Sequence, residues 1–167
     1  RIERIFDSLK DKNIERIIVN GDLKHEFGTI SEQEWRNTLN FLDLLAKHCD
    51  EIVLIKGNHD NILGPIARKR NVQVLDYVII DSLTKKSNDE KSLVKKITKS
   101  IKNKILIAHG NKIPDGEVLK GVATIIIGHE HPAISIKDWP RIETYKCFLK
   151  GKYKGKNLIV QPSFNSI

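Results

Sequence analysis

Short apolar runs that end abruptly in polar residues are the main pattern along the chain. Apolar runs of this length bounded by glycine are typical of buried strands, which present polar side chains where they end. We therefore predict four strands, each tipped by residues able to do chemistry. They are residues 16–20 before Gly21-Asp22, 52–55 before Gly57-Asn58-His59-Asp60, 105–108 before His109-Gly110, and 124–127 before Gly128-His129-Glu130-His131.

Other segments show the spacing of helices. Apolar residues of segment 2–9 recur every three or four positions, which predicts an amphipathic helix covering one face of a sheet. Ser31 followed by Glu34 is a capping-box pattern and predicts that a second helix begins there and continues to Ala46. The lysine-rich segment 84–104 has apolar residues at helical spacing, and we expect a surface helix whose lysines are solvated.

The remaining segments favour strands. Residues 72–80 predict a further strand. From Ala133 onward apolar and polar residues alternate, and Lys154-Gly155 reads as a turn, so this part predicts antiparallel hairpins. The whole pattern indicates an α/β layered domain with helices outside a largely buried sheet.

Composition narrows the class of protein. The 167 residues suit one domain, and no apolar run reaches the length of a membrane span or a signal core, so we expect a cytoplasmic protein with no membrane partner. Cys49 and Cys147 lack a paired-cysteine motif and read as buried reduced thiols. The formal charge of +8 permits anionic partners, although nucleotide bias or a hot habitat accounts for it equally well.

The histidines suggest a metal site. Five of the six lie at or just beyond predicted strand ends, whereas His48 lies near a helix end and reads as structural. Strand-end imidazoles near Asp22 and Asn58 form a ligand set that divalent metals select. Both oxygens of Asp22 can bind metal, so this carboxylate can bridge two cations. Glycine before Asp22, Asn58 and His129 lets the chain turn sharply out of each strand.

In this order, the four strand-end motifs match the signature of calcineurin-like metallophosphoesterases, which the chain resembles over most of its length. The segment from Gly21 to Gly28 and the segment from Gly128 to Pro132 look most similar to archaeal and bacterial phosphoesterases related to the SbcD nuclease subunit. The resemblance implies the layered metallophosphoesterase fold, with mixed β-sheets flanked by helices.

The resemblance also implies roles for individual residues. Two divalent ions are implied, with manganese favoured and iron, zinc, nickel or magnesium as alternatives, and their shared hydroxide would attack phosphorus. His59 would act as a catalytic acid beside the metals, oriented by Asp60 and by His25, although His25 reads equally well as a solvated loop residue. The implied metal ligands are Asp22 as the bridge, Asn58, His109 and His129 at the second metal, and His131 at the first.

One departure from the family pattern affects the first metal. The family opens with an Asp-x-His motif on its first strand, and the 167 residues contain no such motif. We therefore expect a single metallophosphoesterase domain over residues 1–167 that lacks its first strand and its C-terminal end. The alternative is a natural degenerate form.

Three functions remain open. The first is metal-dependent hydrolysis of phosphodiester bonds, with DNA or RNA as a candidate substrate. The second is a phosphomonoesterase acting on a small molecule, and the third is a non-catalytic module of the same fold that binds a partner or nucleic acid. The sequence does not set the oligomeric state.

A basic stretch bears on the substrate. Residues 137–156 hold seven Lys or Arg against Asp138 and Glu143, and we predict that Lys150, Lys152 and Lys154 bind substrate. Trp139 could stack on a base, but packing is the favoured reading.

Overall fold

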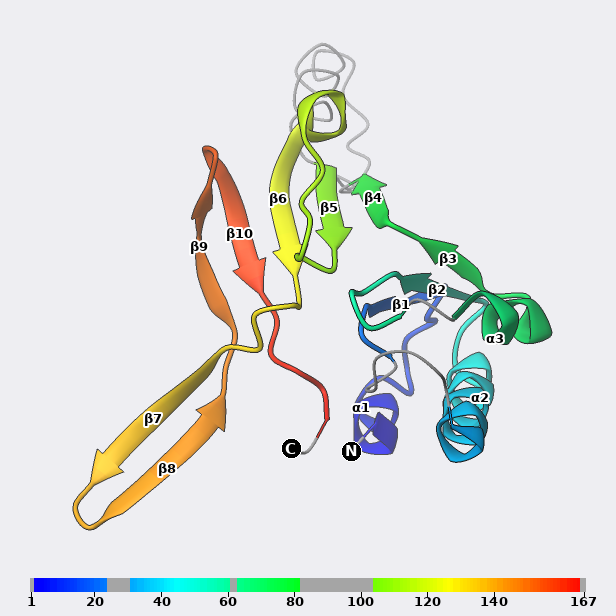
Figure 1. Cartoon of the computed structure of the whole chain (residues 1–167), viewed down its shortest axis with the longest axis horizontal. Coiled ribbons are helices and arrows are strands. Elements are labelled where there is room, and N and C mark those ends of the chain that lie inside the picture. Colours follow the sequence, from blue (N-terminus) through cyan, green and yellow to red (C-terminus); the bar gives the residue numbers. More distant parts are fainter. Residues whose placement is uncertain (1, 24–30, 61–62, 82–103, 166–167) are drawn as a thin grey trace. The chain divides into compact units, whose positions relative to one another are not determined.

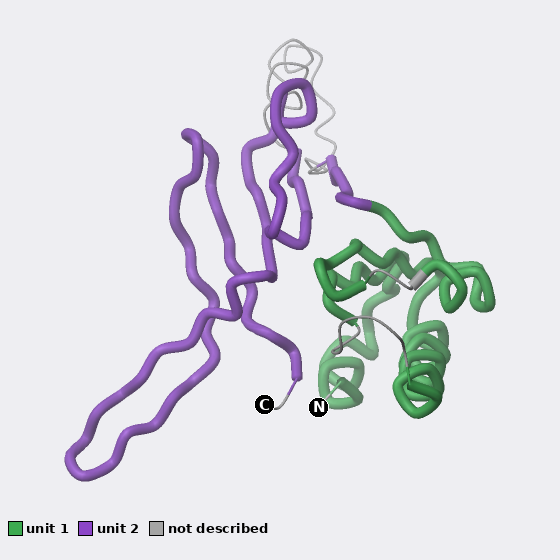
Figure 2. Tube along the Cα trace, in the orientation of Figure 1, with its two compact units in different colours: residues 1–75 green, residues 76–167 purple. Residues whose placement is uncertain are grey.

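The computed structural model describes residues 2–23, 31–60, 63–81 and 104–165 (Figure 1). The chain forms two compact units, residues 1–75 and residues 76–167 (Figure 2). The helix predicted over residues 84–104 lies outside the described residues, apart from Lys104, which begins a strand. His25 also lies outside them.

The first unit is a three-stranded parallel sheet with helices (Figure 1). Its strand order is β1-β2-β3, so β2 is central. The predicted first helix and the strands at 16–20 and 52–55 are confirmed to within one residue at each end. Its elements are α1 (Ile2–Ser8), β1 (Arg16–Asn20), α2 (Glu32–Ala46), β2 (Glu51–Ile55), α3 (Leu63–Arg70) and β3 (Gln73–Leu75).

The second helix begins as the capping-box pattern predicts. The Ser31 side chain accepts a hydrogen bond from the Glu34 backbone N–H at 3.2 Å, which satisfies one amide that the helix itself leaves unpaired. The buried face of α2 places Leu42 and Leu45 against Ile52 and Leu54 of β2, in a core that also holds Phe6 of α1. Both helices therefore cover the same face of the sheet.

Burial along the two predicted strands differs. β2 is buried from Ile52 to Ile55, as expected. β1 is only half-buried, which corrects the prediction of a buried strand, because within the described residues it pairs on one side alone, with β2.

The second unit contains a five-stranded mixed sheet and a separate hairpin (Figure 1). The sheet order is β4-β5-β6-β10-β9, in which β5, β6 and β10 are parallel and the two edge strands are antiparallel to their neighbours. Its elements are β4 (Tyr77–Asp81), β5 (Lys104–Ala108), the short 3-10 helix η2 (Gly116–Leu119), β6 (Val122–Ile127), β7 (Ala133–Asp138), β8 (Arg141–Lys146), β9 (Leu149–Tyr153) and β10 (Lys156–Val160).

Two sequence predictions need correction in this part of the chain. Residues 72–80 form two strands rather than one, since β3 pairs with β2 of the first sheet whereas β4 pairs with β5 of the second. The alternating pattern after Ala133 does form the antiparallel hairpins β7–β8 and β9–β10, with the turn at Lys154-Gly155. In β7–β8, however, the alternation does not produce a buried face.

Two further expectations can be compared with the described residues. None of the described helices is both long and apolar enough to cross a lipid bilayer. Cys49 and Cys147 are free thiols, as predicted, although they are half-buried rather than buried. Burial raises the pKa of the Cys49 thiol, which keeps it protonated and unreactive.

Candidate metal-binding residues

Asp22 sits in a sharp turn directly after β1. Gly21 and Asp22 both have positive φ angles, 79° and 50°. Asp is among the few residues that adopt this left-handed conformation at modest cost. The turn directs the carboxylate toward the loop after β2, where Oδ1 accepts a hydrogen bond from the His59 backbone N–H at 3.1 Å.

Gly57 makes this approach of two loops sterically possible. β1 and β2 are parallel and in register from Arg16 to Asn20, so their carboxyl ends meet at one edge of the sheet. A Cβ atom on residue 57 would lie 2.1 Å from Asp22 Oδ1 and 2.4 Å from Asp22 N. No side chain fits there, so glycine is required for the close approach of the loops.

Asp60 shapes the same loop. Its side chain is 2% exposed, and Oδ2 accepts a hydrogen bond from the Gly57 backbone N–H at 2.9 Å. This bond closes the turn that presents Asn58 and His59, both half-buried. Asp60 therefore holds the loop that carries His59, which is compatible with the orienting role expected for it.

His109 and His129 come together in the second unit. They follow β5 and β6, which are parallel neighbours with Ile107 opposite Ile126. The backbone N–H groups of Gly128 and His129 both donate to the His109 carbonyl oxygen, at 2.8 and 2.9 Å. His109 Nε2 lies 3.1 Å from His129 Nδ1, with the rings edge to face.

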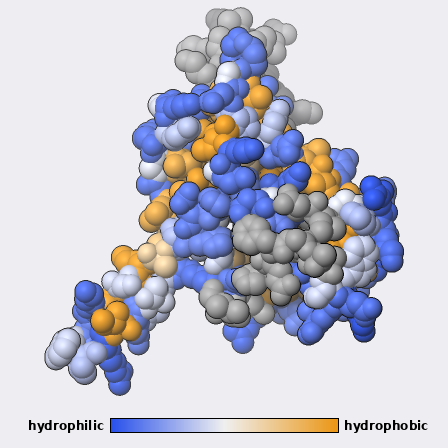
Figure 3. Space-filling model, in the orientation of Figure 1, coloured by the Kyte–Doolittle hydropathy of each residue, from blue (hydrophilic) through white to orange (hydrophobic). Residues whose placement is uncertain are grey.

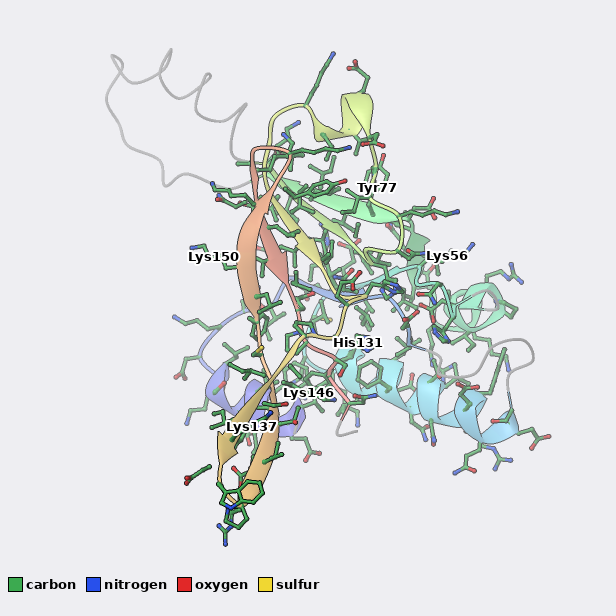
Figure 4. All side chains as sticks on the ribbon, turned by 60° about the vertical axis from the view of Figure 1, so that its left-hand side comes forward. Lys56, Tyr77, His131, Lys137, Lys146 and Lys150 are labelled. Atoms are coloured by element: carbon green, nitrogen blue, oxygen red, sulfur yellow. The ribbon has the colours of Figure 1, made fainter. Side chains whose placement is uncertain are left out.

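Gly110 permits this contact, and His131 completes the loop. Gly110 has φ 120°, and a Cβ there would lie 2.9 Å from Ile127 Cβ and 3.3 Å from His129 Cβ. His131 is exposed, has φ 43°, and stands just before β7 (Figure 4). Its ring is therefore the accessible one of the three histidines, whereas His109 is 2% exposed.

The paired histidines fit a divalent cation. Imidazole nitrogens bind zinc at about 2.0–2.1 Å, so two such ligands of one ion lie roughly 3 Å apart. The 3.1 Å separation between the two ring nitrogens matches that spacing. Neutral imidazole is also the form that binds metal, and it adds no charge to the site.

The predicted substrate lysines differ in their surroundings. Lys150 extends from β9 (Figure 4), whereas Lys152 Nζ donates to Asn157 Oδ1 at 2.7 Å. Lys154 Nζ donates to Asp115 at 2.7 Å, and this hydrogen bond raises the pKa of Lys154. Its charge is partly compensated, so the basic stretch is a weaker anion site than its sequence suggests.

Two features of the second unit differ from the sequence predictions. Trp139 is 93% exposed at the turn between β7 and β8, so the expectation that it packs against other residues is wrong. Gln161, directly after β10, lies at the same edge of the sheet as the end of β6, although no role was predicted for it. The Gln161 backbone N–H donates to the Ile127 carbonyl oxygen at 2.7 Å. The apolar run 158–160 before it was the available signal.

Comparison by sequence relates the chain to a known family. The profile of the family described as "Calcineurin-like phosphoesterase" matches residues 1–150. A comparison with curated proteins finds no match.

Two similar solved structures are Vps29 proteins. One is a single mutant of Vps29 from Entamoeba histolytica, with 16% identity, a TM-score of 0.47, and coverage of 96% of this chain and 64% of that one. The other is Vacuolar Protein Sorting 29 from Cryptosporidium parvum, with 12% identity, a TM-score of 0.34, and coverage of 86% and 94%. The chain thus spans less than two thirds of the Entamoeba structure.

The fold is a mixed α/β arrangement of several sheets with flanking helices, as the resemblance implied. The family profile covers nearly the whole chain, including all four strand-end motifs. The chain therefore belongs to the calcineurin-like phosphoesterase family.

Proposed function

We propose that the chain is a metal-dependent phosphoesterase that hydrolyses phosphodiester bonds. The observation that carries this proposal is the convergence of His109 and His129, whose ring nitrogens are 3.1 Å apart at the ends of adjacent parallel strands. A divalent cation at this position would be held by both ring nitrogens in their unprotonated form.

The proposed ligands are the five residues that the sequence pattern singled out. They are Asp22, Asn58, His109, His129 and His131. Two divalent cations would supply, when bound, Lewis-acid activation of a water nucleophile and neutralisation of phosphoryl charge. Manganese is the favoured metal.

The neighbouring loop residues have supporting roles in this proposal. The backbone N–H of His59 donates to Asp22, and we assign the His59 imidazole ring to a phosphoryl oxygen or a leaving group. Asp60 contributes by closing the loop through Gly57. His25 is proposed as a second orienting residue.

We further propose a relation to the SbcD nuclease subunit and a nucleic-acid substrate in the cytoplasm. The relation to SbcD is supported by the segment from Gly128 to Pro132. The nucleic-acid substrate is supported by Lys150 and its neighbours, since seven cations lie within residues 137–156.

The test is a manganese-supplemented assay of the full protein against single-stranded DNA, duplex DNA, and aryl phosphate mono- and diesters. His109→Gln should abolish hydrolysis of every substrate, whereas His48→Gln, a histidine outside the proposed site, should leave it unchanged. Faster cleavage of the aryl monoester than of all diesters would favour the phosphomonoesterase.

The outcome that overturns the enzyme is also clear. If no substrate is cleaved with manganese, iron, zinc, nickel or magnesium, and upstream sequence carries no Asp-x-His strand, the chain is a non-catalytic module of this fold.

A further inference from the structure

The β7–β8 hairpin leaves its apolar side chains uncovered. All of β7 and nearly all of β8 are exposed, with apolar residues at the surface (Figure 3). The two strands form a sheet of their own (Figure 1). A two-stranded hairpin is marginally stable in water unless one face packs against something. The exposed fractions are 54% for Ile134 and 55% for Ile136. This hairpin therefore needs a partner surface.

The strand register divides the hairpin into two faces. Cross-strand partners of an antiparallel pair point to the same side, and side chains alternate along each strand. The hydrogen bond from the Tyr145 hydroxyl to Glu143 lies within one face, and the 3.0 Å contact between the Ser135 and Thr144 hydroxyls lies within the other. Face A is defined by the pairs Ile134 with Tyr145, Ile136 with Glu143, and Asp138 with Arg141.

The composition of face A disfavours nucleic acid as its occupant. Asp138 and Glu143 would repel phosphates and outnumber Arg141, the one cation of the face, and Tyr145 is its one ring on which a base could stack. A face that combines isoleucines with both signs of charge is instead suited to a protein surface of the same kind.

We propose that face A is a self-association surface on which a second copy of this chain packs, through a two-fold axis parallel to the strands. Rotation about such an axis leaves each residue at the same height along the strand direction. It places β8 of the second copy opposite β7 of the first, and β7 of the second copy opposite β8 of the first. Each cross-strand pair of the register then becomes a contact between copies, made twice. Asp138 meets Arg141 of the second copy, and Ile134 meets Tyr145 of the second copy.

Charge complementarity selects this axis over the alternative. A two-fold axis across the strands would reverse the levels, placing Asp138 over Ile134 and Arg141 over Tyr145. That arrangement would cover both charges with apolar side chains of the second copy and leave only the pairing inside each hairpin to compensate them, which is costly. The parallel axis pairs them between copies and covers Ile134 with an aromatic ring. It places Glu143, which accepts a hydrogen bond from the Tyr145 hydroxyl, against Ile136 of the second copy, whereas the axis across the strands would place two Glu143 side chains against each other.

The small size of the face sets the expected affinity. Stable interfaces bury about 800 Å² on each partner, and six residues cover less than that. We therefore expect a weak, reversible dimer.

The test uses two charge variants of the full chain in sedimentation equilibrium. Asp138→Arg alone and Arg141→Asp alone each oppose like charges between copies, and each should raise the dimer dissociation constant by about tenfold or more. An equimolar mixture of the two chains should form a heterodimer with near-parental affinity. Each variant still has like charges within its own hairpin, so rescue by mixing isolates the contact between copies.

Matched controls lie on the other face. Lys137→Glu, next to Asp138 in the chain, changes the charge by the same amount and sign as Arg141→Asp, but it should leave the dissociation constant unchanged. Ile136→Ser should weaken the dimer, whereas Ile142→Ser should not, although Ile142 is the more exposed at 62%. Melting temperatures near that of the parent would establish that each variant folds.

Two results would overturn the proposal. One is a parent chain that stays monomeric up to millimolar concentration, which would mean that face A is covered within the monomer or remains solvated. The other is a mixture of the two folded charge variants that dissociates as readily as either variant alone.

Discussion

At the scale of single residues, Asp22 combines a structural and a chemical task. Its Oδ1 atom accepts the His59 amide hydrogen, and its backbone has φ 50°. Asparagine tolerates that conformation and retains the acceptor, so Asp22→Asn should keep the turn while removing the charge. Loss of a group that only supports a metal ligand reduces activity by about 10- to 100-fold. Because Asp22 is proposed as a ligand itself, we expect metal-dependent hydrolysis to fall by more than about 100-fold. Initial rates against manganese concentration measure this.

Asp22→Ala is the companion variant. It removes the acceptor as well as the charge and places alanine at a positive φ angle, so it should lose both hydrolysis and about 1 kcal/mol or more of unfolding free energy. Full activity of either variant in excess chelator would contradict the metal mechanism.

His59 is expected to affect turnover without affecting metal binding. His59→Asn leaves the backbone N–H that bonds Asp22 in place and changes only the ring. Turnover should fall by about 10²- to 10⁴-fold, the usual contribution of a general acid. Calorimetric titration with manganese should give near-parental affinity. If affinity and turnover collapse together, His59 is a ligand and its assigned role is wrong.

At the scale of elements, the junction of the loops after β1 and β2 depends on Gly57. Gly57→Ala would place a methyl group 2.1 Å from Asp22 Oδ1, so one loop must move. We expect a loss of about 3 kcal/mol in unfolding free energy, measured by urea denaturation, together with loss of metal binding. Gly64→Ala is the matched control, because its Cβ would meet its nearest neighbour at 3.9 Å, and its effect should stay within about 1 kcal/mol.

The elements were largely predictable from sequence, whereas the contacts between them were not. An apolar run such as 105–108 marks its own strand, and the polar residue after it marks the carboxyl end. Nothing local reveals that Gly57 touches Asp22, that His109 faces His129, or that residues 72–80 divide between two sheets. Each of these facts depends on strand partners that are distant in sequence. The exposure of Trp139 was missed for the same reason, since no local signal states what a hairpin packs against.

At the scale of the whole molecule, the formal charge of +8 raises the question of whether binding to DNA reflects net charge or a local surface. Both give salt-dependent binding. If net charge governs DNA binding, removing the same number of charges anywhere should weaken it equally. If a local surface governs binding, only removal of the charges of that surface should weaken it. Lys150, Lys152 and Lys154 therefore need a control of equal charge elsewhere, and the exposed Lys10, Lys12 and Lys47 provide it.

Changing Lys150, Lys152 and Lys154 together to glutamine should flatten the salt dependence of single-stranded DNA binding. Each phosphate contact contributes a log-log slope of about −0.7, so loss of all three would reduce the slope by roughly 2. Lys154 is already paired with Asp115, so a smaller reduction, nearer the value for two contacts, is expected. The same change at Lys10, Lys12 and Lys47 should leave the slope unaltered. Neither triple variant should slow hydrolysis of a small aryl diester, because the proposed metal ligands are intact in both. Equal slopes for both triple variants would assign the effect to net charge, and an unchanged slope and affinity in the Lys150 set would favour a small phosphate ester as the substrate.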